Sequence, residues 1–394
     1  MKNLSIIKLS MITVASLTIA PLVFADSIPS VVVTVENVAP ERGGFQTPVW
    51  GGIHDGTFDI YDRDVALGNT EANPELISRE SVERIAEDGI TGPITEEFSE
   101  LQPGAAQTTF LAPGGPLQPG SRSSTTLNIN NPSVERYFSY ASMVIPSNDA
   151  FVANGSPLAH EIFNERGRFV AEDFIVAGSE VLDAGTEVND EIASNTAFLN
   201  QAGPNIGTEE NGVITLSPGF AAPGALAYPN GVLNHPAFAN ADFTAPGVRT
   251  LQFNFRYVDL GRRVRLNGQL SPEQEIAPEL VDSNASGRVI LTARNGEEVS
   301  VRAFFRRLSD APVAAHLHLG QAGVNGPIVV DLTAGLRRNS LRSSIKASDV
   351  VGPLADSEDP FRNLLNELAA GNVYLNIHTA ENPAGELRGQ ISLR

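Results

Sequence analysis

Residues 315–327 read AHLHLGQAGVNGP, and residues 371–391 read GNVYLNIHTAENPAGELRGQI. Apolar and polar side chains alternate at the start of each stretch, and this period of two predicts β-strands. On such strands His316 and His318 point to one face, while the aliphatic residues between them point to the other. His378 likewise lies off the aliphatic face of the second strand. The two stretches therefore predict a β-domain in which three histidines lie outside the aliphatic core.

These two stretches resemble the paired signatures of the CHRD domain, a module that is repeated in the extracellular protein chordin and also occurs in bacterial envelope and secreted proteins. The resemblance implies a β-domain over about residues 262–394 that serves in binding or structure and not in catalysis. Within it, Asn382-Pro383-Ala384-Gly385 is typical of a turn that joins two strands into a hairpin.

Three uses of the histidines stay open at this point. If the two strands are neighbours, His316, His318 and His378 can meet, and His-x-His on a strand is a ligand pattern for copper or zinc. The pattern also resembles one strand of copper-zinc superoxide dismutase, although the rest of that enzyme's ligand set has no counterpart here. The alternative is that the imidazoles only form hydrogen bonds across the sheet or to a loop. A copper- or zinc-dependent oxidoreductase is thus the second functional hypothesis.

The first 25 residues are typical of a secretory signal peptide. Lys2 and Lys8 supply a positive start, Met11 to Phe24 is almost wholly apolar or small, and Ala25 ends a small-x-Ala cleavage site. We expect a mature chain that begins near Asp26 and lies in the periplasm or outside the cell. No later stretch approaches about 18 apolar residues, so we expect no transmembrane segment in the mature chain.

Charge divides the remaining chain into two parts. Residues 26–248 carry a net charge of −22 and residues 249–394 a net charge of +1, within a total of −19. Such a difference predicts two domains, at residues 26–245 and 262–394, with residues 246–261 as a linker or shared strand. The acidic part repels nucleic acid, which we exclude as a partner, and attracts cations. The chain contains no cysteine, which excludes disulfides and thiolate chemistry.

The pattern of short apolar runs and turn residues predicts an all-β fold, with two antiparallel β-sandwich or barrel domains and a few short covering helices. Strands are expected at residues 31–35, 137–145, 251–257, 288–292 and 299–304. Helices are expected at residues 81–88 and between the capping residue Asp359 and Gly371. Residues 101–124 and 218–236 are rich in Pro, Gly and small polar residues and are expected to be loops or linkers.

The acidic part resembles the spondin N-terminal domain over about residues 30–220. The best match runs from Phe138-Ser139-Tyr140 to Val144–Phe151 and then to Asp183-Ala184-Gly185-Thr186-Glu187. That family has an antiparallel β-sandwich of C2-like character that carries one calcium ion, so the resemblance implies a calcium site here. Asp149 and Asp183 carry over directly, and Glu187 carries over with a longer side chain.

Asp190 extends the candidate calcium set because it follows on the same loop. Calcium takes six to eight oxygen ligands, and loops at one end of a sandwich can bring distant carboxylates together. The alternative for all four acidic residues is that they only cap turns, as aspartate commonly does.

No classical catalytic motif occurs: there is no Gly-x-Ser-x-Gly elbow, no phosphate-binding loop and no His-Glu-x-x-His helix. We therefore expect a secreted or periplasmic non-catalytic protein of binding or cell adhesion, whose ligand is an extracellular protein or glycan. Calcium is the expected cofactor, and copper or zinc is the alternative one. A purely structural envelope protein is the third hypothesis.

Overall fold

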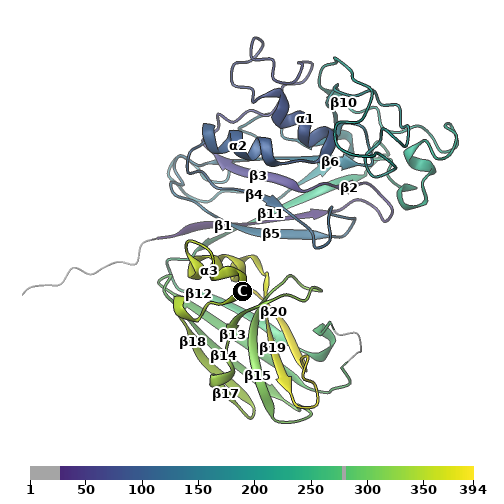
Figure 1. The fold of residues 1–394 in the computed structure, drawn as a ribbon. Coiled ribbons are helices and arrows are strands. Elements are labelled where there is room, and N and C mark those ends of the chain that lie inside the picture. The colour runs from purple at the N-terminus through teal and green to yellow at the C-terminus, as the bar shows by residue number, and fades with distance from the viewer. Residues whose placement is uncertain (1–26, 277–280) are drawn as a thin grey trace, which may run out of the picture.

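The computed structural model describes residues 27–276 and 281–394, so the predicted signal peptide lies outside the described residues. The described chain is mostly β-sheet with three short α-helices, and this confirms the all-β prediction. Strands up to Asp259 form an N-terminal unit, and strands from Val264 onward form a C-terminal unit, drawn above and below one another in Figure 1. No helix within the described ranges is long and apolar enough to cross a membrane.

Two antiparallel sheets build the N-terminal unit. The four-stranded sheet has the order β5-β1-β11-β8, with β1 at Pro29–Asn37, β5 at Arg122–Asn128, β8 at Phe174–Ala177 and β11 at Arg249–Asp259. The seven-stranded sheet has the order β10-β9-β7-β6-β3-β4, with β2 beside β6. Its strands are β2 (Phe45–Gln46), β3 (Val49–His54), β4 (Gln107–Phe110), β6 (Tyr137–Ile145), β7 (Ala150–Ala153), β9 (Leu182–Asp183) and β10 (Thr215–Leu216).

The two sheets pack face to face through apolar side chains. Val31, Val33 and Val35 of β1 are fully buried, and they share one apolar cluster with Phe138 of β6 and Val49 of β3. The opposite face of the four-stranded sheet is polar, and that face turns toward the C-terminal unit.

Two helices cover the outer face of the seven-stranded sheet. Helix α1 (Arg79–Asp88) matches the predicted helix; it is capped by Ser78 and ends at Gly89, whose φ is 66°. Helix α2 (Gly92–Leu101) was not predicted, because a Gly-Pro start and scattered Thr and Ser are also typical of a loop. Both helices bury their apolar faces in a second cluster around Trp50.

The C-terminal unit is one nine-stranded antiparallel sheet that curls around a single core. Its order is β16-β15-β19-β20-β12-β13-β14-β18-β17. The strands are β12 (Val264–Leu270), β13 (Ser286–Arg294), β14 (Glu298–Arg306), β15 (Pro312–Leu319), β16 (Ile328–Asp331), β17 (Leu336–Arg337), β18 (Ser340–Ile345), β19 (Val373–Thr379) and β20 (Leu387–Leu393). The predicted hairpin is β19–β20, which pairs Val373 with Ile391.

Helix α3 (Pro360–Ala370) packs on this core as the sequence predicts. The Asp359 carboxylate accepts a hydrogen bond from the backbone N–H of Arg362, and Gly371 ends the helix with a φ of 81°. Helical spacing places Leu364 and Leu368 fully in the core. The 3₁₀ turns of the chain are Gly178–Glu180, Val232–Asn234, Pro236–Phe238, Pro272–Gln274, Thr333–Gly335, Ala347–Asp349 and Gly352–Leu354.

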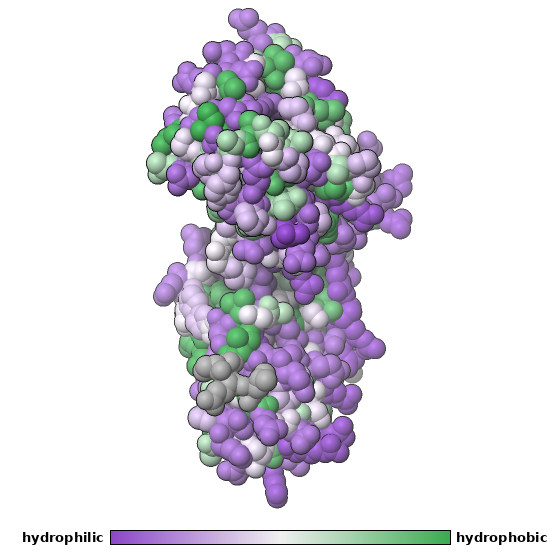
Figure 2. All heavy atoms as spheres, turned by 90° about the vertical axis from the view of Figure 1, so that its right-hand side faces the viewer, coloured by the Kyte–Doolittle hydropathy of each residue, from purple (hydrophilic) through white to green (hydrophobic). Residues whose placement is uncertain are grey.

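The two units meet along the polar face of the four-stranded sheet. Asn372, just after α3, donates a hydrogen bond to the backbone oxygen of Ser124 at 3.0 Å, and Thr126 donates to the backbone oxygen of Asn366 at 2.7 Å. Val32 of β1 joins the apolar core of the C-terminal unit. On the face shown in Figure 2, hydrophilic residues predominate over both units.

The structure assigns one segment that the sequence left open and corrects another. Residues 251–257, which the sequence did not assign to either domain, lie in β11 and pair with β1 and β8 of the N-terminal unit. Residues 101–124 were expected to be a loop, but they contain β4 and the start of β5. That prediction was wrong because Thr, Ser and Gln, which are common in loops, also suit a strand with one polar face.

Candidate metal centres

Strands β15 and β19 place the three histidines on one face of the C-terminal sheet. The two strands pair antiparallel, with Ala314 opposite His378 and His316 opposite Asn376. Leu317 and Ile377 are fully buried on the core side, and their burial forces the alternating histidines to the other side. The strands that the sequence predicts are therefore neighbours, and the three imidazoles meet.

The histidine side chains form a compact group of nitrogen atoms. The Nδ1 of His316 lies 3.1 Å from the Nε2 of His378. One ring nitrogen from each of His316, His318 and His378 lies within 4.8 Å of the others, and among the residues that the structure describes this is the one such group of three metal-ligating side chains. Nitrogen ligands about 2.0–2.1 Å from a tetrahedral zinc ion are separated by about 3.3 Å, so small rotations of the rings suffice to bind an ion.

Backbone carbonyls fix the orientation of two rings. The Nδ1–H of His318 donates to the oxygen of Gly326 at 2.9 Å, and the Nδ1–H of His378 donates to the oxygen of Pro383 at 3.0 Å. Each contact leaves the Nε2 of its ring unprotonated. The Nε2 of His378 lies against His316, and the Nε2 of His318 is buried with no hydrogen-bond partner among the described residues. Carbonyls that hold the second nitrogen of an imidazole are the usual outer support of histidine metal ligands.

A carboxylate and an aromatic ring also lie next to the histidine rings. The Nε2 of His316 lies 3.8 Å from the Oδ1 of Asp331 on β16. The ring of His318 stacks on Tyr374, with 4.9 Å between the ring centroids. These supporting residues were not found from the sequence, because the pairing of β15 with β16 and β19 is needed to bring them together.

Burial favours the neutral form of His318 and His378. Desolvation lowers the pKa of His318 and of His378, and each of these rings is further disfavoured as a cation by its histidine neighbours. Neutral imidazoles are the form that coordinates metal. Three imidazole nitrogens can hold zinc or copper and leave a fourth coordination position open.

The acidic candidates lie at the turn between β6 and β7 and on the loop after β9. Asp149 is fully buried, and its Oδ2 accepts hydrogen bonds from the backbone N–H groups of Thr186 (2.8 Å) and Glu187 (3.1 Å). Its Oδ1 has no hydrogen-bond partner among the described residues. Asp149 therefore anchors the predicted acidic loop through its Oδ2, while its Oδ1 has no hydrogen-bond donor among the described residues.

The remaining acidic candidates have local partners. Asp183 pairs with Ala150 across β9 and β7, and its carboxylate accepts from the N–H of Gly185 and from the amide of Asn189. Asp190 accepts from Asn195 in its own loop. Within the described ranges no three carboxylates present oxygens within 4.8 Å of one another, so the structure does not gather Asp149, Asp183, Glu187 and Asp190 into one coordination shell.

Burial and repulsion between neighbouring carboxylates nevertheless raise the pKa of two of these acidic residues. Burial, with Asp183 close by, raises the pKa of Asp149 to about 7. Burial, followed by the charge of Glu87 on α1, raises the pKa of Glu187 to about 8. Sequence reasoning missed Glu87, which gives no signal beyond its place on an amphipathic helix.

Glu187 faces a second group of acidic residues rather than Asp190. It lines a cavity of about 490 Å³ together with Glu83, Glu87, Glu209 and Glu210. Its Oε2 is buried without a hydrogen-bond partner among the described residues. A Cβ on Gly207 would lie 2.1–2.3 Å from the atoms of this carboxylate, so a larger residue at this position would displace the Glu187 side chain.

The comparisons with known proteins agree with the C-terminal fold. Residues 266–391 match the family model of the CHRD domain. The matched range contains all three histidines and the β19–β20 hairpin, so this part of the sequence-based resemblance is confirmed. None of the curated proteins matches the chain. The match does not extend to residues 30–220, and the spondin resemblance stays a prediction.

Proposed function

We propose that this chain is a non-catalytic binding protein of the periplasm or the cell exterior, in which the CHRD region holds a zinc or copper ion on His316, His318 and His378. CHRD domains occur in exported proteins as interaction modules, which supports the location and the general role. The observation that carries the metal assignment is the convergence of three imidazole rings, two of which, His318 and His378, have their other nitrogen held by a backbone carbonyl.

The ion would cross-link neighbouring segments at one end of the sheet. The Gly326 carbonyl belongs to the loop between β15 and β16, and the Pro383 carbonyl belongs to the turn between β19 and β20. A metal on the three histidines would therefore fix both turns and both strands together. A ligand that binds only the folded state stabilises that state by mass action.

A calorimetric titration of the full chain with zinc chloride, and separately with copper, tests this assignment. We expect one site per chain in the unaltered protein and a loss of affinity of at least a hundredfold in the His316→Ala, His318→Ala and His378→Ala variants. His235→Ala, which removes an imidazole from the other unit, is the matched control and should bind as the unaltered chain does. Unchanged zinc and copper affinity in His318→Ala would refute the three-histidine site.

The second candidate function is the copper-dependent oxidoreductase. The open fourth coordination position favours it, because the side chain of His316 is 18% exposed and solvent can reach the ion. Oxygen consumption by the copper-loaded protein with ascorbate decides between the two. Turnover no faster than that of free copper supports the non-catalytic role, and turnover that is lost in His316→Ala supports the enzyme.

We further propose that the N-terminal unit is a spondin-like domain that binds calcium through Asp149, Asp183, Glu187 and Asp190. The bare Oδ1 of Asp149 and the bare Oε2 of Glu187 support this assignment, because buried carboxylate oxygens without donors are relieved by a cation. The structure places Glu187 beside Glu87, so the calcium shell would need movement of the loop after β9.

A further inference from the structure

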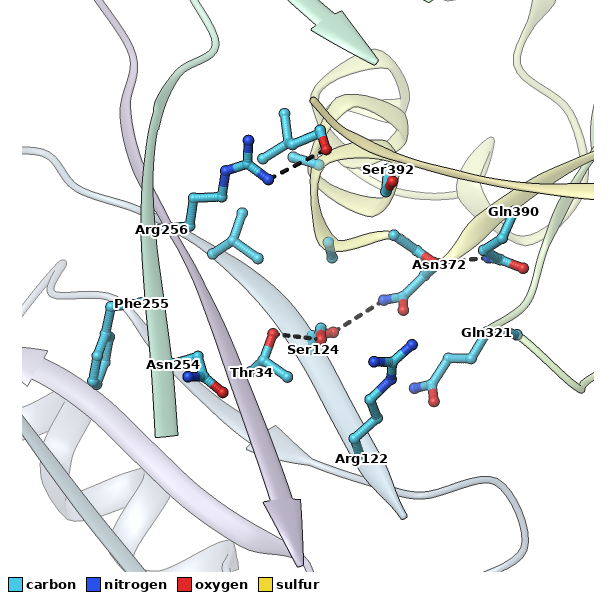
Figure 3. A pocket seen from close by; sticks show the side chains of 16 residues that line it. Thr34, Arg122, Ser124, Asn254, Phe255, Arg256, Gln321, Asn372, Gln390 and Ser392 are labelled. Atoms are coloured by element: carbon cyan, nitrogen blue, oxygen red, sulfur yellow. Dashed lines mark hydrogen bonds between the residues drawn. The ribbon is translucent and has the colours of Figure 1, made fainter. Parts of the chain in front are cut away.

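A cavity of about 610 Å³ with both polar and apolar lining lies between the two units (Figure 3). One wall is the outward face of β1, β5 and β11, and the other is the end of α3, the end of β20 and the loop after β15. Its lining residues are Val32, Thr34, Arg122, Ser124, Asn254, Phe255, Arg256, Gln321, Ala322, Ala369, Ala370, Gly371, Asn372, Gln390, Ser392 and Leu393. The volume is in the range of small-molecule sites, which often lie between domains.

The charge of this lining is opposite to that of the chain. The lining contains two arginines and no aspartate or glutamate, whereas the whole chain has 46 acidic and 27 basic residues. The contrast in charge is larger still for the N-terminal unit, which contributes both arginines. This unit holds only 8 basic residues within residues 26–248, and β11 adds Arg249 and Arg256. A cationic recess in so acidic a unit points to an anionic ligand.

The two arginines differ in their availability. Arg256 donates hydrogen bonds to the backbone oxygens of Leu393 and Arg394, so it ties the last strand to the N-terminal unit. Arg122 forms no hydrogen bond and no ion pair with any residue that the structure describes. Glu36 lies opposite Arg122 in the β1–β5 register, but it does not line the cavity. Arg122 is therefore the group that is free to bind an anion.

Uncharged hydrogen-bonding groups surround Arg122. Figure 3 shows Arg122 and Gln321 extending from opposite units into the same space. The amide of Gln321 and the hydroxyl of Ser392 have no hydrogen-bond partner among the described residues. Ala322, Ala369 and Ala370 add small apolar patches. Phe255 points away from this space, so the cavity offers no aromatic platform for a flat ring.

We propose that this cleft binds a short acidic saccharide, with the forked guanidinium of Arg122 on a sugar carboxylate and the amide and hydroxyl side chains on sugar hydroxyls. A planar guanidinium matches a carboxylate with two parallel hydrogen bonds. The net charge of −22 on residues 26–248 repels a long polyanion, which limits the ligand to a short oligomer or a chain end. The inference names the ligand class of the proposed binding function and does not depend on the metal.

A titration of the full chain with trigalacturonic acid, galactotriose and sodium sulfate tests this proposal. We expect saturable binding of trigalacturonic acid at least tenfold tighter than that of the neutral trimer or of sulfate. Equal binding of the acidic and neutral trimers, or of trigalacturonic acid and sulfate, would overturn the proposal. A run with the His318→Ala variant separates the two assignments, since loss of the metal site should leave saccharide affinity unchanged.

Variants locate the binding to the cleft. Arg122→Gln should weaken trigalacturonic acid binding at least tenfold, and Arg122→Lys, which keeps the charge but loses the fork, should recover only part of it. Arg302→Gln removes the same charge from an exposed position on β14 and should bind as the unaltered chain does. An Arg122→Gln variant with an unchanged melting temperature and unchanged affinity would show that the cleft is not the site. Gln321→Ala, on the opposite wall, provides an independent check with an expected loss of about threefold.

Discussion

The Nδ1 of His316 lies 3.1 Å from the Nε2 of His378, and this contact fixes which nitrogen of each ring carries a proton. The Nδ1–H of His378 donates to the Pro383 carbonyl, so the Nε2 of His378 is an acceptor. His316 must then donate through its Nδ1–H in the metal-free protein. Coordination through the Nδ1 of His316 requires the proton to move to its Nε2, which faces Asp331 at 3.8 Å.

The first prediction is a change of tautomer at His316 when zinc binds. Long-range ¹H–¹⁵N spectra of the histidine side chains should show the Nδ1–H form of His316 without metal and the Nε2–H form with zinc. His318 and His378 should keep the Nδ1–H form throughout, because their carbonyl partners do not change. Retention of the Nδ1–H form of His316 in zinc-saturated protein would rule out its Nδ1 as a ligand.

The second prediction concerns Asp331, whose carboxylate faces the Nε2 of His316 that would carry that proton. Asp331→Asn should weaken zinc binding by about tenfold, at the lower end of the effects measured for outer-shell partners, because Asp331 is exposed and its contact with His316 is long. Asp310→Asn is the charge-matched control and should leave the affinity unchanged. A Kd for zinc in Asp331→Asn equal to that of Asp310→Asn would remove Asp331 from the metal centre.

The third prediction tests calcium in the N-terminal unit. The histidine site is first removed with a His316→Ala, His318→Ala double variant, because EGTA also strips zinc. In that background we expect 5 mM calcium to raise the melting temperature above its value in EGTA, since calcium would neutralise the repelling carboxylates around Asp149. Introducing Asp183→Asn into the same double variant should reduce the rise in melting temperature that calcium causes.

The control for the calcium test is Asp310→Asn, an exposed aspartate of the C-terminal unit, in the same background. It should keep the full response to calcium. Superimposable melting curves in calcium and in EGTA would show that Asp149 and its neighbours act as loop anchors without a cation, which the hydrogen bonds from Thr186 and Glu187 to Asp149 already explain.

The histidine centre shows what the sequence could predict. The alternation around His316 and His318 places both on one face, because the side-chain period of a strand is two. The meeting with His378 requires the pairing of β15 with β19, about 60 residues apart, and no local pattern fixes such a pairing. The partners Gly326, Pro383 and Asp331 depend on the same long-range pairing and were not predicted.

In the acidic N-terminal unit, proximity in the sequence was a poor guide to which side chains meet. Asp149 and Asp183 were expected to converge at one end of the sandwich, and the pairing of β7 with β9 sets Asp183 opposite Ala150, the residue after Asp149. Glu187 was grouped with Asp190 by sequence proximity, but the chain turns its side chain toward Glu87 on α1. Arg122 gave no sequence signal at all, because its importance arises from the docking of the C-terminal unit against β5.

The fourth prediction is a loss of stability in mild acid that comes from His54. This side chain is fully buried; its Nδ1 accepts from the N–H of Gly56, and its Nε2–H therefore donates to Ser139 at 2.8 Å. Desolvation lowers the pKa of His54 from 6.5 to about 4. Between these two values the unfolded chain binds a proton on His54 that the folded chain does not, so the contribution of His54 to the free energy of unfolding falls as the pH decreases from about 6.5 to 4. The raised pKa values of Asp149 and Glu187 act in the opposite direction, so the His54 effect is read as a difference between variants.

The size and the assignment of this acid effect are both measurable. A pKa difference of this size corresponds to about 3 kcal/mol, and the second buried histidine, His160, whose pKa is also lowered to about 4 by desolvation, adds to the loss. In urea unfolding between pH 8 and 4, the free energy of unfolding of the unaltered chain should fall relative to that of His54→Gln as the pH decreases, whatever the absolute stability of the variant. His235→Gln should keep the full dependence. An identical slope in His54→Gln and the unaltered chain would mean that His54 is protonated in the folded state, in which case its ring could not accept the hydrogen bond from Gly56.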